Sequence, residues 1–354
     1  MMQCNRLTGL VATLAMAAAT MAPGVAPGVA AARSGHAPSH VYRWYQHIFV
    51  IMLENHAHDQ IIGNPLAPHL NALARTYGLA MRYYGITHPS EPNYVAVVGG
   101  NYFGIQDDAP YTTKTPVNHT IAAPNLADQV EAAGLTWTSY QQGLPYVGYT
   151  GVAYPTTGRP LYLSKHNPFL NFADVQHNRA RLRHIVPIAQ LDVDVRGGRA
   201  PNVGFIVPDL CHDMHGQWPM CRSPHAPGDA YDRRLIRLGD AYVGTLVQTI
   251  TSSPMWSVGN NAVIITWDEN DFIPRSKGYN NVGGTGCCDA SPGGGRIPTI
   301  VITSHGPRGV RDDTPYNHYA LLRTVEVALH LGCLQHTCDS AHVHVMRKLF
   351  MTRG

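Results

Sequence analysis

Short, uninterrupted apolar runs are the feature that most constrains the fold of this chain. They occupy residues 47–53, 203–207, 262–267 and 297–303, and they are rich in Val and Ile. None of them alternates strictly between apolar and polar residues, as a strand with one wet face would. Such runs are typical of strands that are buried on both faces, which is the condition of a parallel sheet covered by helices.

Helix-like segments lie between these runs, and a Gly or Pro stops each of them. The segments are 65–77, 125–133, 229–251 and 316–331, which Gly78, Gly134, Pro254 and Gly332 terminate. Strands that alternate with helices predict an α/β fold, doubly wound, with a mostly parallel central sheet and helices on both faces. The long Gly- and Pro-rich loops 140–160 and 270–295 are typical of segments that build a site.

The N-terminus has the pattern of an export signal. Arg6 precedes an apolar run over 7–18, and small residues follow it. We expect a signal peptide over 1–30, a flexible lead-in over 31–41 and a single domain over 42–354. The apolar run is short for a membrane span, although a membrane-tethered N-terminal helix is the alternative. The expected location is therefore secreted or periplasmic, with no transmembrane span in the mature chain.

The cysteine count agrees with export. Six cysteines follow the leader: Cys211, Cys221, Cys287, Cys288, Cys333 and Cys338. An even number in an exported chain favours disulfides, and the local pairs 211–221 and 333–338 are preferred. The adjacent pair 287–288 can bridge or stay reduced. A zinc site is less favoured, because no C-x2-C spacing is present.

Charge and composition exclude a nucleic-acid partner. Charged residues make up 14% of the chain and the net charge is +3, with no Lys/Arg-rich run. A nucleic-acid-binding surface needs clustered positive charge. The 20 histidines are compatible with a hydrolase, because imidazole titrates near neutral pH and binds metals and phosphates.

Oxygen-bearing side chains follow two of the apolar runs directly. Glu54 and Asn55 come after the first run, and Asp268 and Glu269 come after the third. In open parallel sheets, ligands bind in the crevice beyond the carboxyl ends of the strands. These four residues can therefore hold a hard or borderline divalent cation. Polar residues that simply face water are the alternative, but two such clusters favour a metal site.

A serine stands where a helix is expected to begin. Pro92, near the start of an apolar stretch, suits the first helical turn, which places Ser90 in the N-cap region. Free N–H groups at that end attract a phosphate. A base or a metal can activate the hydroxyl as a nucleophile. A plain helix cap is the other interpretation of Ser90, and the local sequence does not separate the two.

Histidines and a lysine supply further candidates. His212 and His215 follow the run over 203–207 and can bind phosphate oxygens or protonate a leaving group. Metal ligands or surface histidines are the alternatives. His318 opens the helix-like segment that Asn317 or Thr314 can cap. Lys165 and His166 lie in a polar turn and can contact phosphate.

Six motifs in order carry a resemblance to a known family. They are residues 51–56 (IMLENH), 88–94 (HPSEPNY), 165–169 (KHNPF), 211–215 (CHDMH), 266–271 (TWDEND) and 317–326 (NHYALLRTVE). Together they span most of the mature chain. The chain resembles the bacterial phosphoesterase family of acid phosphatases and non-haemolytic phospholipases C, in the alkaline-phosphatase-like superfamily.

The resemblance implies roles for the matching residues. Ser90 is similar to the nucleophile that forms a phosphoserine. Metal ligands implied by the likeness are Glu54, Asn55, Ser90, Asp268 and Glu269. Histidines implied to line the site are His212, His215 and His318, and substrate-binding candidates are Asn93, Lys165 and His166.

The expected function is that of a secreted, metal-dependent phosphoesterase acting on small phosphate monoesters. The divalent metal ion is not specified by the motifs. The family's phospholipases are longer and carry additional C-terminal domains, so a phospholipid substrate is less favoured. A phospholipase C or other phosphodiesterase on the same scaffold is one alternative, and a non-catalytic exported metal- or phosphate-binding protein is another.

Overall fold

The computed structural model describes residues 44–217, 219–221, 229–271, 285–288, 290 and 293–351. The expected signal peptide and lead-in lie outside these residues, as does most of the loop over 270–295. Among the described helices, none is long and apolar enough to cross a bilayer.

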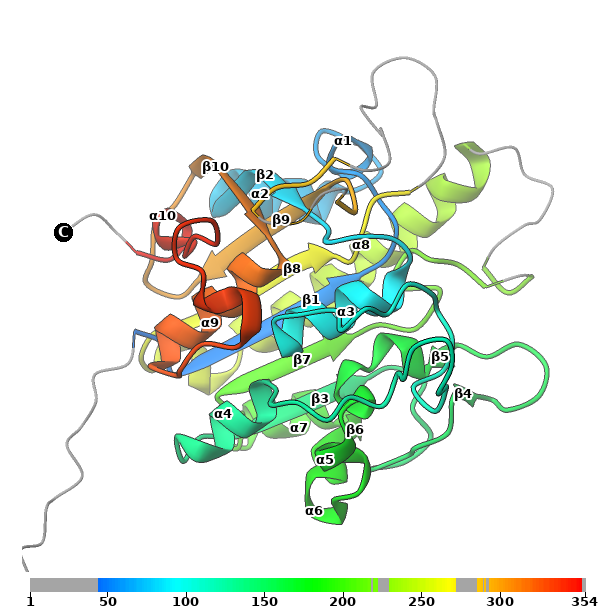
Figure 1. Cartoon of the computed structure of the whole chain (residues 1–354). Coiled ribbons are helices and arrows are strands. Elements are labelled where there is room, and N and C mark those ends of the chain that lie inside the picture. The colour runs from blue at the N-terminus through cyan, green and yellow to red at the C-terminus, as the bar shows by residue number, and fades with distance from the viewer. Residues whose placement is uncertain are drawn as a thin grey trace, which may run out of the picture. The chain divides into compact units, whose positions relative to one another are not determined.

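A mixed sheet forms the centre of the described part of the chain (Figure 1). Its strands, in spatial order, are β10 (Val310–Asn317), β2 (Gly78–Tyr84), β9 (Arg296–Thr303), β8 (Asn261–Trp267), β1 (His47–Leu53), β7 (Val203–Val207), β3 (Trp137–Gln141) and β6 (Ile185–Pro187). Every neighbouring pair is parallel except the two that involve β9, which is antiparallel to β2 and β8. The mostly parallel sheet expected from the apolar runs is therefore confirmed. A short ribbon, β4 (Ala153–Tyr154) with β5 (Tyr162–Leu163), lies apart from it.

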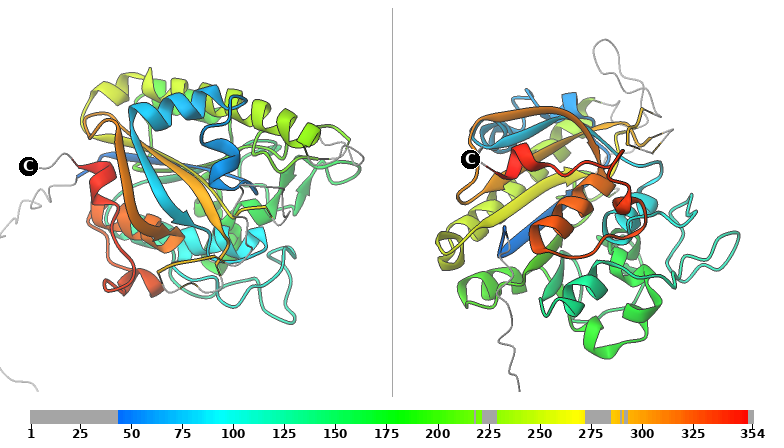
Figure 2. Two further views of the ribbon diagram at one scale, coloured as in Figure 1. Left: turned by 90° about the horizontal axis from the view of Figure 1, so that it is seen from above. Right: turned by 60° about the vertical axis from the view of Figure 1, so that its left-hand side comes forward.

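Helices cover both faces of this sheet. The α-helices are α1 (His58–Ile61), α2 (Pro68–Thr76), α3 (Ser90–Gly99), α4 (Leu126–Ala132), α5 (Ala173–Gln176), α6 (Arg179–Leu182), α7 (Gln190–Arg196), α8 (Asp229–Thr251), α9 (His318–Leu329) and α10 (Arg347–Phe350). The 3-10 turns are η1 (Ser164–His166), η2 (Pro168–Asn171), η3 (Pro254–Ser257) and η4 (Gln335–Cys338). Figure 2 shows α2 and α8 on one face, with α3 and α9 on the other.

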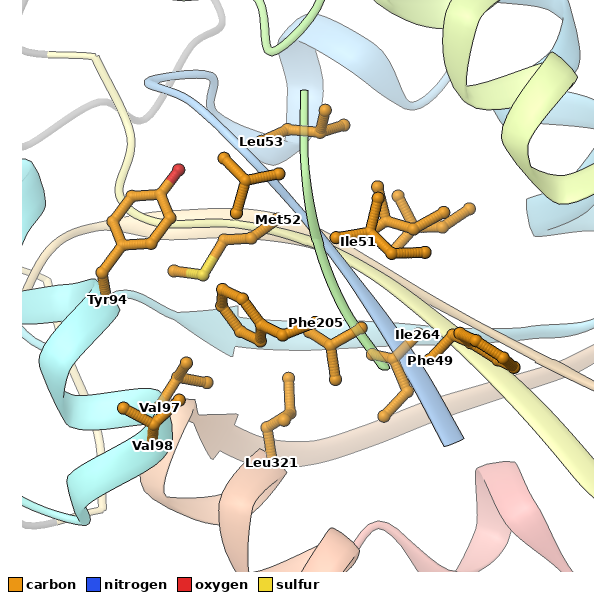
Figure 3. Close-up of a cluster of buried hydrophobic side chains, with 14 of the residues drawn as sticks. Phe49, Ile51, Met52, Leu53, Tyr94, Val97, Val98, Phe205, Ile264 and Leu321 are labelled. Atoms are coloured by element: carbon orange, nitrogen blue, oxygen red, sulfur yellow. The ribbon is translucent and has the colours of Figure 1, made fainter. Parts of the chain in front are cut away.

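The core is densest around β1, which is the strand that the site is built on. Figure 3 shows Met52 of β1 and Phe205 of β7 facing Tyr94, Val97 and Val98 of α3, together with Leu321 of α9. The side chains of Phe49 and Ile51 point to the opposite side of the sheet, as the pleat requires. All of these side chains are buried. Burial on both faces explains why this strand has an uninterrupted apolar sequence.

Four strands of the sheet did not follow from the apolar runs, namely β2, β3, β6 and β10. The sequence of β10 is polar and contains Pro315, which is compatible with its place at the edge of the sheet. The neighbouring β2 contains Arg82, whose side chain is exposed, so it lacks a continuous apolar sequence. The helix expected over 316–331 begins two residues later, because β10 extends to Asn317, which caps α9 through a hydrogen bond from the N–H of Ala320.

The six cysteines after the expected leader form disulfides. Cys211 is bonded to Cys221 and Cys333 to Cys338, which are the two local pairings that the spacing favours. Cys287 and Cys288 also form a bridge, so the adjacent pair is oxidised in this structure. Disulfides persist in oxidising compartments.

Candidate active site

The register between β1 and β8 brings the first two acidic segments together. Leu53 pairs with Trp267 across the parallel strands, so the residues that follow them, Glu54 and Asp268, leave the sheet side by side. The N–H of Asp268 donates to the carbonyl of Leu53 at 2.9 Å, and the N–H of Asn55 donates to Asp268 Oδ1 at 2.9 Å. The two chain segments, more than 200 residues apart in sequence, therefore share one hydrogen-bonded corner.

The loop after β7 closes the other side of this corner. Glu54 donates its N–H to the carbonyl of Asp213 at 2.8 Å, and the carboxylate of Asp213 is fully buried. His166 of η1 lies between the two acids, with Nε2 at 3.1 Å from Glu54 Oε1 and Nδ1 at 3.6 Å from Asp213 Oδ2. The ring of His166 stacks on Tyr94 of α3 with centroids 5.0 Å apart. Three parallel strands thus contribute to the same site.

Ser90 enters the site from the start of α3. Its Oγ donates a hydrogen bond to Glu54 Oε2 at 3.0 Å, and the side chain is buried. The N-cap position belongs to Pro89, so Ser90 is the first residue of the helix and does not cap it. Ser90 thus lies in the N-cap region, as expected, one position after the N-cap itself. The hydroxyl bonds to a distant carboxylate, which is the contact that a reactive group needs and a local cap does not make.

Asn93 holds the loop that leads to Ser90. Its Oδ1 accepts hydrogen bonds from the N–H groups of Ile86 at 2.8 Å and Thr87 at 3.2 Å. Its Nδ2 donates to the carbonyls of Thr87 at 2.8 Å and Pro89 at 3.0 Å. The fully buried amide is therefore engaged with the backbone of the loop before α3.

Buried carboxylates outnumber cations at this site. Burial raises the pKa of Glu54, Asp213, Asp268 and Glu269. The negative charges of neighbouring acids raise the pKa of Glu54, Asp213 and Glu269 further. Lys165 lies within electrostatic reach of them, with Nζ at 2.7 Å from Asp108 Oδ2. Burial lowers the pKa of Lys165, but the charges of Glu54 and Asp108 more than offset this and raise it. Among the described residues, this one ammonium group does not balance four buried acids, and a bound cation would stabilise their charged forms.

Several buried oxygens at this corner also lack hydrogen-bond donors. They are Asn55 Oδ1 and Asp268 Oδ2, while Glu54 Oε1 has only the imidazole of His166. In the described part of the chain, no group of three or more His, Cys, Asp or Glu side chains is arranged to hold a metal ion. A cation here would therefore need the Asn55 amide and the Ser90 hydroxyl beside the carboxylates. Such a mixed oxygen set suits a hard divalent ion.

Glu269 lies against His88. Its Oε2 contacts the Nδ1 atom of His88, two residues before Ser90. Burial lowers the pKa of His88 to about 4, which keeps this imidazole neutral around neutral pH. The carboxylate of Glu269 thus ties the end of β8 to the loop that carries the serine.

The three expected catalytic histidines occupy different places. His318 is fully buried, with Nε2 at 2.6 Å from the carbonyl of Asp268 and Nδ1 at 3.2 Å from the hydroxyl of Tyr83. His215 is partly exposed, with its ring centroid 6.0 Å from that of His166. His212 is bonded to Asp209 at 2.8 Å and stacks on Tyr242, outside the carboxylate corner.

Two participants were not singled out as site residues from the sequence. Asp213 and His88 were noticed only as parts of motifs. Asp213 lies six residues beyond the end of β7, and His88 precedes the serine. Their membership follows from contacts made after folding, although the position of Asp213 beyond a buried strand was a usable signal.

The carboxyl ends of the mostly parallel sheet thus carry an acidic corner, with a serine at the start of a covering helix, in an α/β protein. The model of the phosphoesterase family matches residues 64–332, and the chain belongs to this family.

Curated relatives agree with this assignment. The chain is 30% identical over 283 residues to a phosphatidylinositol-3-phosphatase of Mycobacterium tuberculosis, covering 80% of this chain and 76% of the relative. It is 28% identical over 285 residues to a probable acid phosphatase of Kluyveromyces lactis, covering 80% of this chain and 58% of the relative. An acid phosphatase of Aspergillus fumigatus is 26% identical over 283 residues, covering 79% of this chain and 54% of the relative. The chain thus spans little more than half the length of the two fungal relatives.

Solved structures show the same fold. A protein in the alkaline phosphatase superfamily from Vibrio parahaemolyticus matches with a TM-score of 0.51 at 14% identity, covering 81% of this chain and 67% of that one. A lipoteichoic acid synthase from Listeria monocytogenes matches with a TM-score of 0.53 at 11% identity, covering 87% and 74%. At these identities the likeness concerns the fold alone.

Proposed function

We propose that this chain hydrolyses phosphate monoesters, with Ser90 as nucleophile and a divalent cation held by Glu54, Asn55, Ser90, Asp268 and Glu269. The observation that carries the proposal is the hydrogen bond from Ser90 Oγ to Glu54 Oε2 at 3.0 Å, inside a group of buried acids. A hydroxyl placed there is close to the atoms that would bind the ion. Relatives named acid phosphatases support the same reaction.

The bound cation supplies Lewis-acid stabilisation of charge on the serine and phosphoryl oxygens. The residues of the chain do the rest. Ser90 stands at the N-terminus of the ten-residue helix α3, where free N–H groups favour a phosphate. Lys165 adds a positive charge near Glu54 and Asp268. The ester phosphate is therefore expected to lie between the helix start and the carboxylate corner.

The reaction has two steps that balance as ester hydrolysis. Ser90 Oγ forms a bond to phosphorus while the bond to the alcohol oxygen breaks, and the serine proton passes to the carboxylate of Glu54, which already accepts it in a hydrogen bond. The leaving oxygen takes a proton from an imidazole, for which His215 is the candidate. Water then attacks the phosphorus of the phosphoserine and gives up one proton to the imidazole. The bond from phosphorus to Ser90 Oγ breaks, Glu54 returns its proton to Oγ, and phosphate is released.

The other candidates act indirectly. His318 binds the carbonyl of Asp268 and so fixes the direction of that carboxylate. His166 bridges Glu54 and Asp213 and keeps both acids in place beside the serine. We assign both as positioning residues. His212, which is bonded to Asp209 and stacked on Tyr242, orients the loop that carries His215.

We also propose that residues 42–354 act as one phosphoesterase domain that follows a cleaved export signal. The three disulfides support an oxidising compartment. N-terminal sequencing of protein recovered from the medium or periplasm tests this. Cleavage near residue 30 is expected, and an intact N-terminus in the membrane fraction contradicts it.

Trapping the covalent intermediate tests the mechanism. Protein incubated with a monoester is quenched in acid and digested, and the peptide that contains Ser90 is expected to carry one phosphoryl group. The peptide from a Ser90→Ala variant is expected to carry none.

A substrate panel tests the preferred ester, with turnover measured on a monoester, a diester and phosphatidylcholine. Preference for the diester or the lipid favours the phospholipase C alternative. That alternative is considered because a relative in Mycobacterium tuberculosis is named phospholipase C B. Phosphate binding without turnover of any substrate favours the non-catalytic alternative.

A further inference from the structure

A cavity of about 640 Å³ adjoins the candidate active site. His88, whose ring contacts the carboxylate of Glu269, forms part of its wall together with Thr87. Asn101 and Gln106, which follow α3, also line the cavity. Small-molecule sites in proteins have volumes of roughly 300–1,000 Å³. The cavity is therefore large enough for an organic group and lies beside the proposed chemistry.

Both ends of α3 contribute to this cavity. His88 precedes the helix and Asn101 follows it. Since α3 has ten residues, its two ends are separated by about 15 Å at the usual rise per residue. The cavity thus leads away from the nucleophile end of the helix towards its other end. A group joined to a phosphate at Ser90 would extend in this direction.

A disulfide-closed loop supplies another wall. Cys333 and Cys338 enclose η4, and the N–H of His336 donates to the carbonyl of Gly100 at 3.1 Å. Gly100 has φ 69°, and a Cβ atom there would lie 2.4 Å from the carbonyl of Leu334, so only glycine permits this contact. The ring of His336 stacks on Tyr319 of α9 with centroids 4.6 Å apart. Both rings face the cavity that they line.

The side chains that line the cavity in the described part of the chain are mostly polar and carry no carboxylate, ammonium or guanidinium group. Hydroxyls, amides and imidazoles come from Thr87, His88, Asn101, Tyr102, Gln106 and His336. Among the described residues that line the cavity, none is Asp, Glu, Lys or Arg, and the only aliphatic side chains are those of Ile86 and Ala290. Such a surface offers hydrogen bonds to hydroxyl groups. It offers few apolar contacts to an acyl chain.

We propose that this cavity binds the leaving alcohol of the substrate, and that this alcohol is a neutral, hydroxyl-rich ring of monosaccharide to disaccharide size. The proposal rests on the phosphomonoesterase function given above. The structure therefore assigns His336 and Gln106 as specificity-determining residues, although both are distant from Ser90 in sequence. Apolar or cationic alcohols make fewer hydrogen bonds to these amides and hydroxyls than a sugar ring does, which is the basis of discrimination.

The test compares substrates that share the phosphate and differ in the alcohol. Rates are measured for a hexose monophosphate, phenyl phosphate and phosphocholine with the full-length protein. The hexose monophosphate is expected to have a kcat/KM at least about 10-fold above the other two. Gln106→Leu is expected to lower that value about 10-fold, which corresponds to about 1.4 kcal/mol. The same variant should change phenyl phosphate turnover less than about 2-fold, because a general disturbance of the structure would lower the rates of both substrates alike.

A matched control separates local from general effects. Gln248→Leu makes the same substitution at an exposed position of α8, on the other face of the sheet, and is expected to change none of the rates. Free hexose is expected to inhibit competitively, and less strongly after His336→Ala. Equal kcat/KM for all three substrates, or a preference for phosphocholine, overturns the cavity assignment while leaving the phosphatase function intact. Absence of turnover on every substrate overturns the proposed function itself.

Discussion

Ser90 Oγ lies 3.0 Å from Glu54 Oε2, and this hydrogen bond joins the first turn of α3 to the end of β1. The contact spans 36 residues of sequence. It places the hydroxyl beside the corner at which the segments after β1, β7 and β8 meet. A serine that merely capped its helix would bond to the backbone of its own first turn. The hydrogen bond to Glu54 is the contact on which the proposed role of Ser90 as nucleophile rests.

The first prediction concerns the nucleophile. Ser90→Ala is expected to lower kcat by about 10⁴-fold or more, because removal of a nucleophile from a concerted site costs this much in serine hydrolases. The fold should remain, because the substitution removes only the hydroxyl group, with its hydrogen bond to Glu54, and keeps the Cβ atom as a methyl group. Ser253→Ala, at another buried serine, serves as the control and should keep full activity. Turnover of the Ser90→Ala variant near the wild-type rate removes the assignment.

The second prediction concerns the cation. Chelation is expected to abolish activity, and a divalent ion should restore it. Asp268→Asn is expected to lower the bound metal below one equivalent per chain and to reduce kcat/KM by about 100-fold or more. Substitution of residues that only hydrogen-bond to a metal ligand already costs about 10–100-fold in metal affinity or activity. Asp240→Asn alters a buried carboxylate that accepts hydrogen bonds from the start of α2. That control should retain metal. Stoichiometric metal in Asp268→Asn would show that the ion binds elsewhere.

The third prediction concerns the backbone behind the acids. A Cβ atom at Gly85 would lie 2.7 Å from the carbonyl of Asp268 and 3.2 Å from the Cα of Glu269. Gly85→Ala must therefore displace the end of β8, and displacements near an ångström can cost about 100-fold in rate. We expect kcat/KM to fall at least about 10-fold. Gly332→Ala has open space around its Cβ and is the matched control. Equal activity of both variants contradicts this close approach.

The fourth prediction concerns pH and stability. Burial raises the pKa of Glu326 in α9 to about 7, and Gln129 Nε2 donates to its Oε1 at 3.1 Å. Because the folded-state pKa lies above the unfolded value of 4.5, the stability contributed by the protonated acid is fully present below about pH 4.5 and is lost as the pH rises through about 7. Glu326→Gln removes this dependence.

Urea unfolding of both proteins, with disulfides intact, measures the effect. The free energy of unfolding of Glu326→Gln minus that of wild type should be near zero at pH 4.5. It should grow by up to about 3 kcal/mol by pH 8, at about 1.4 kcal/mol per unit of pKa shift. A difference that stays constant across this range contradicts a raised pKa at Glu326.

The strands that could be predicted from the sequence are those whose side chains are buried on both faces of the sheet. The run over 47–53 became β1 and the run over 203–207 became β7 without a change of boundary, because every residue after the first position of β1 is buried. The antiparallel direction of β9 carried no sequence signal, since its apolar residues are buried like those of its parallel neighbours. Edge strand β10 was missed because it is polar.

The part of the candidate site that could be predicted consists of residues that directly follow a buried strand. Glu54 and Asp268 directly follow buried strands, so the pairing of β1 with β8 is sufficient to bring them together. Asp213 and His88 lie on loops whose paths depend on many contacts, among them the backbone bonds that Asn93 makes. Loop residues of this kind have no periodic pattern from which a position in space can be inferred.

Anomalous diffraction from crystals soaked with manganese and orthovanadate tests the central claim most directly. We expect one manganese peak within about 2.0–2.6 Å of oxygens from Glu54, Ser90 and Asp268, the range of oxygen ligands of hard divalent ions, with vanadium next to Ser90 Oγ. Manganese bound at another place, or vanadate bound with Ser90 far from it, contradicts the account.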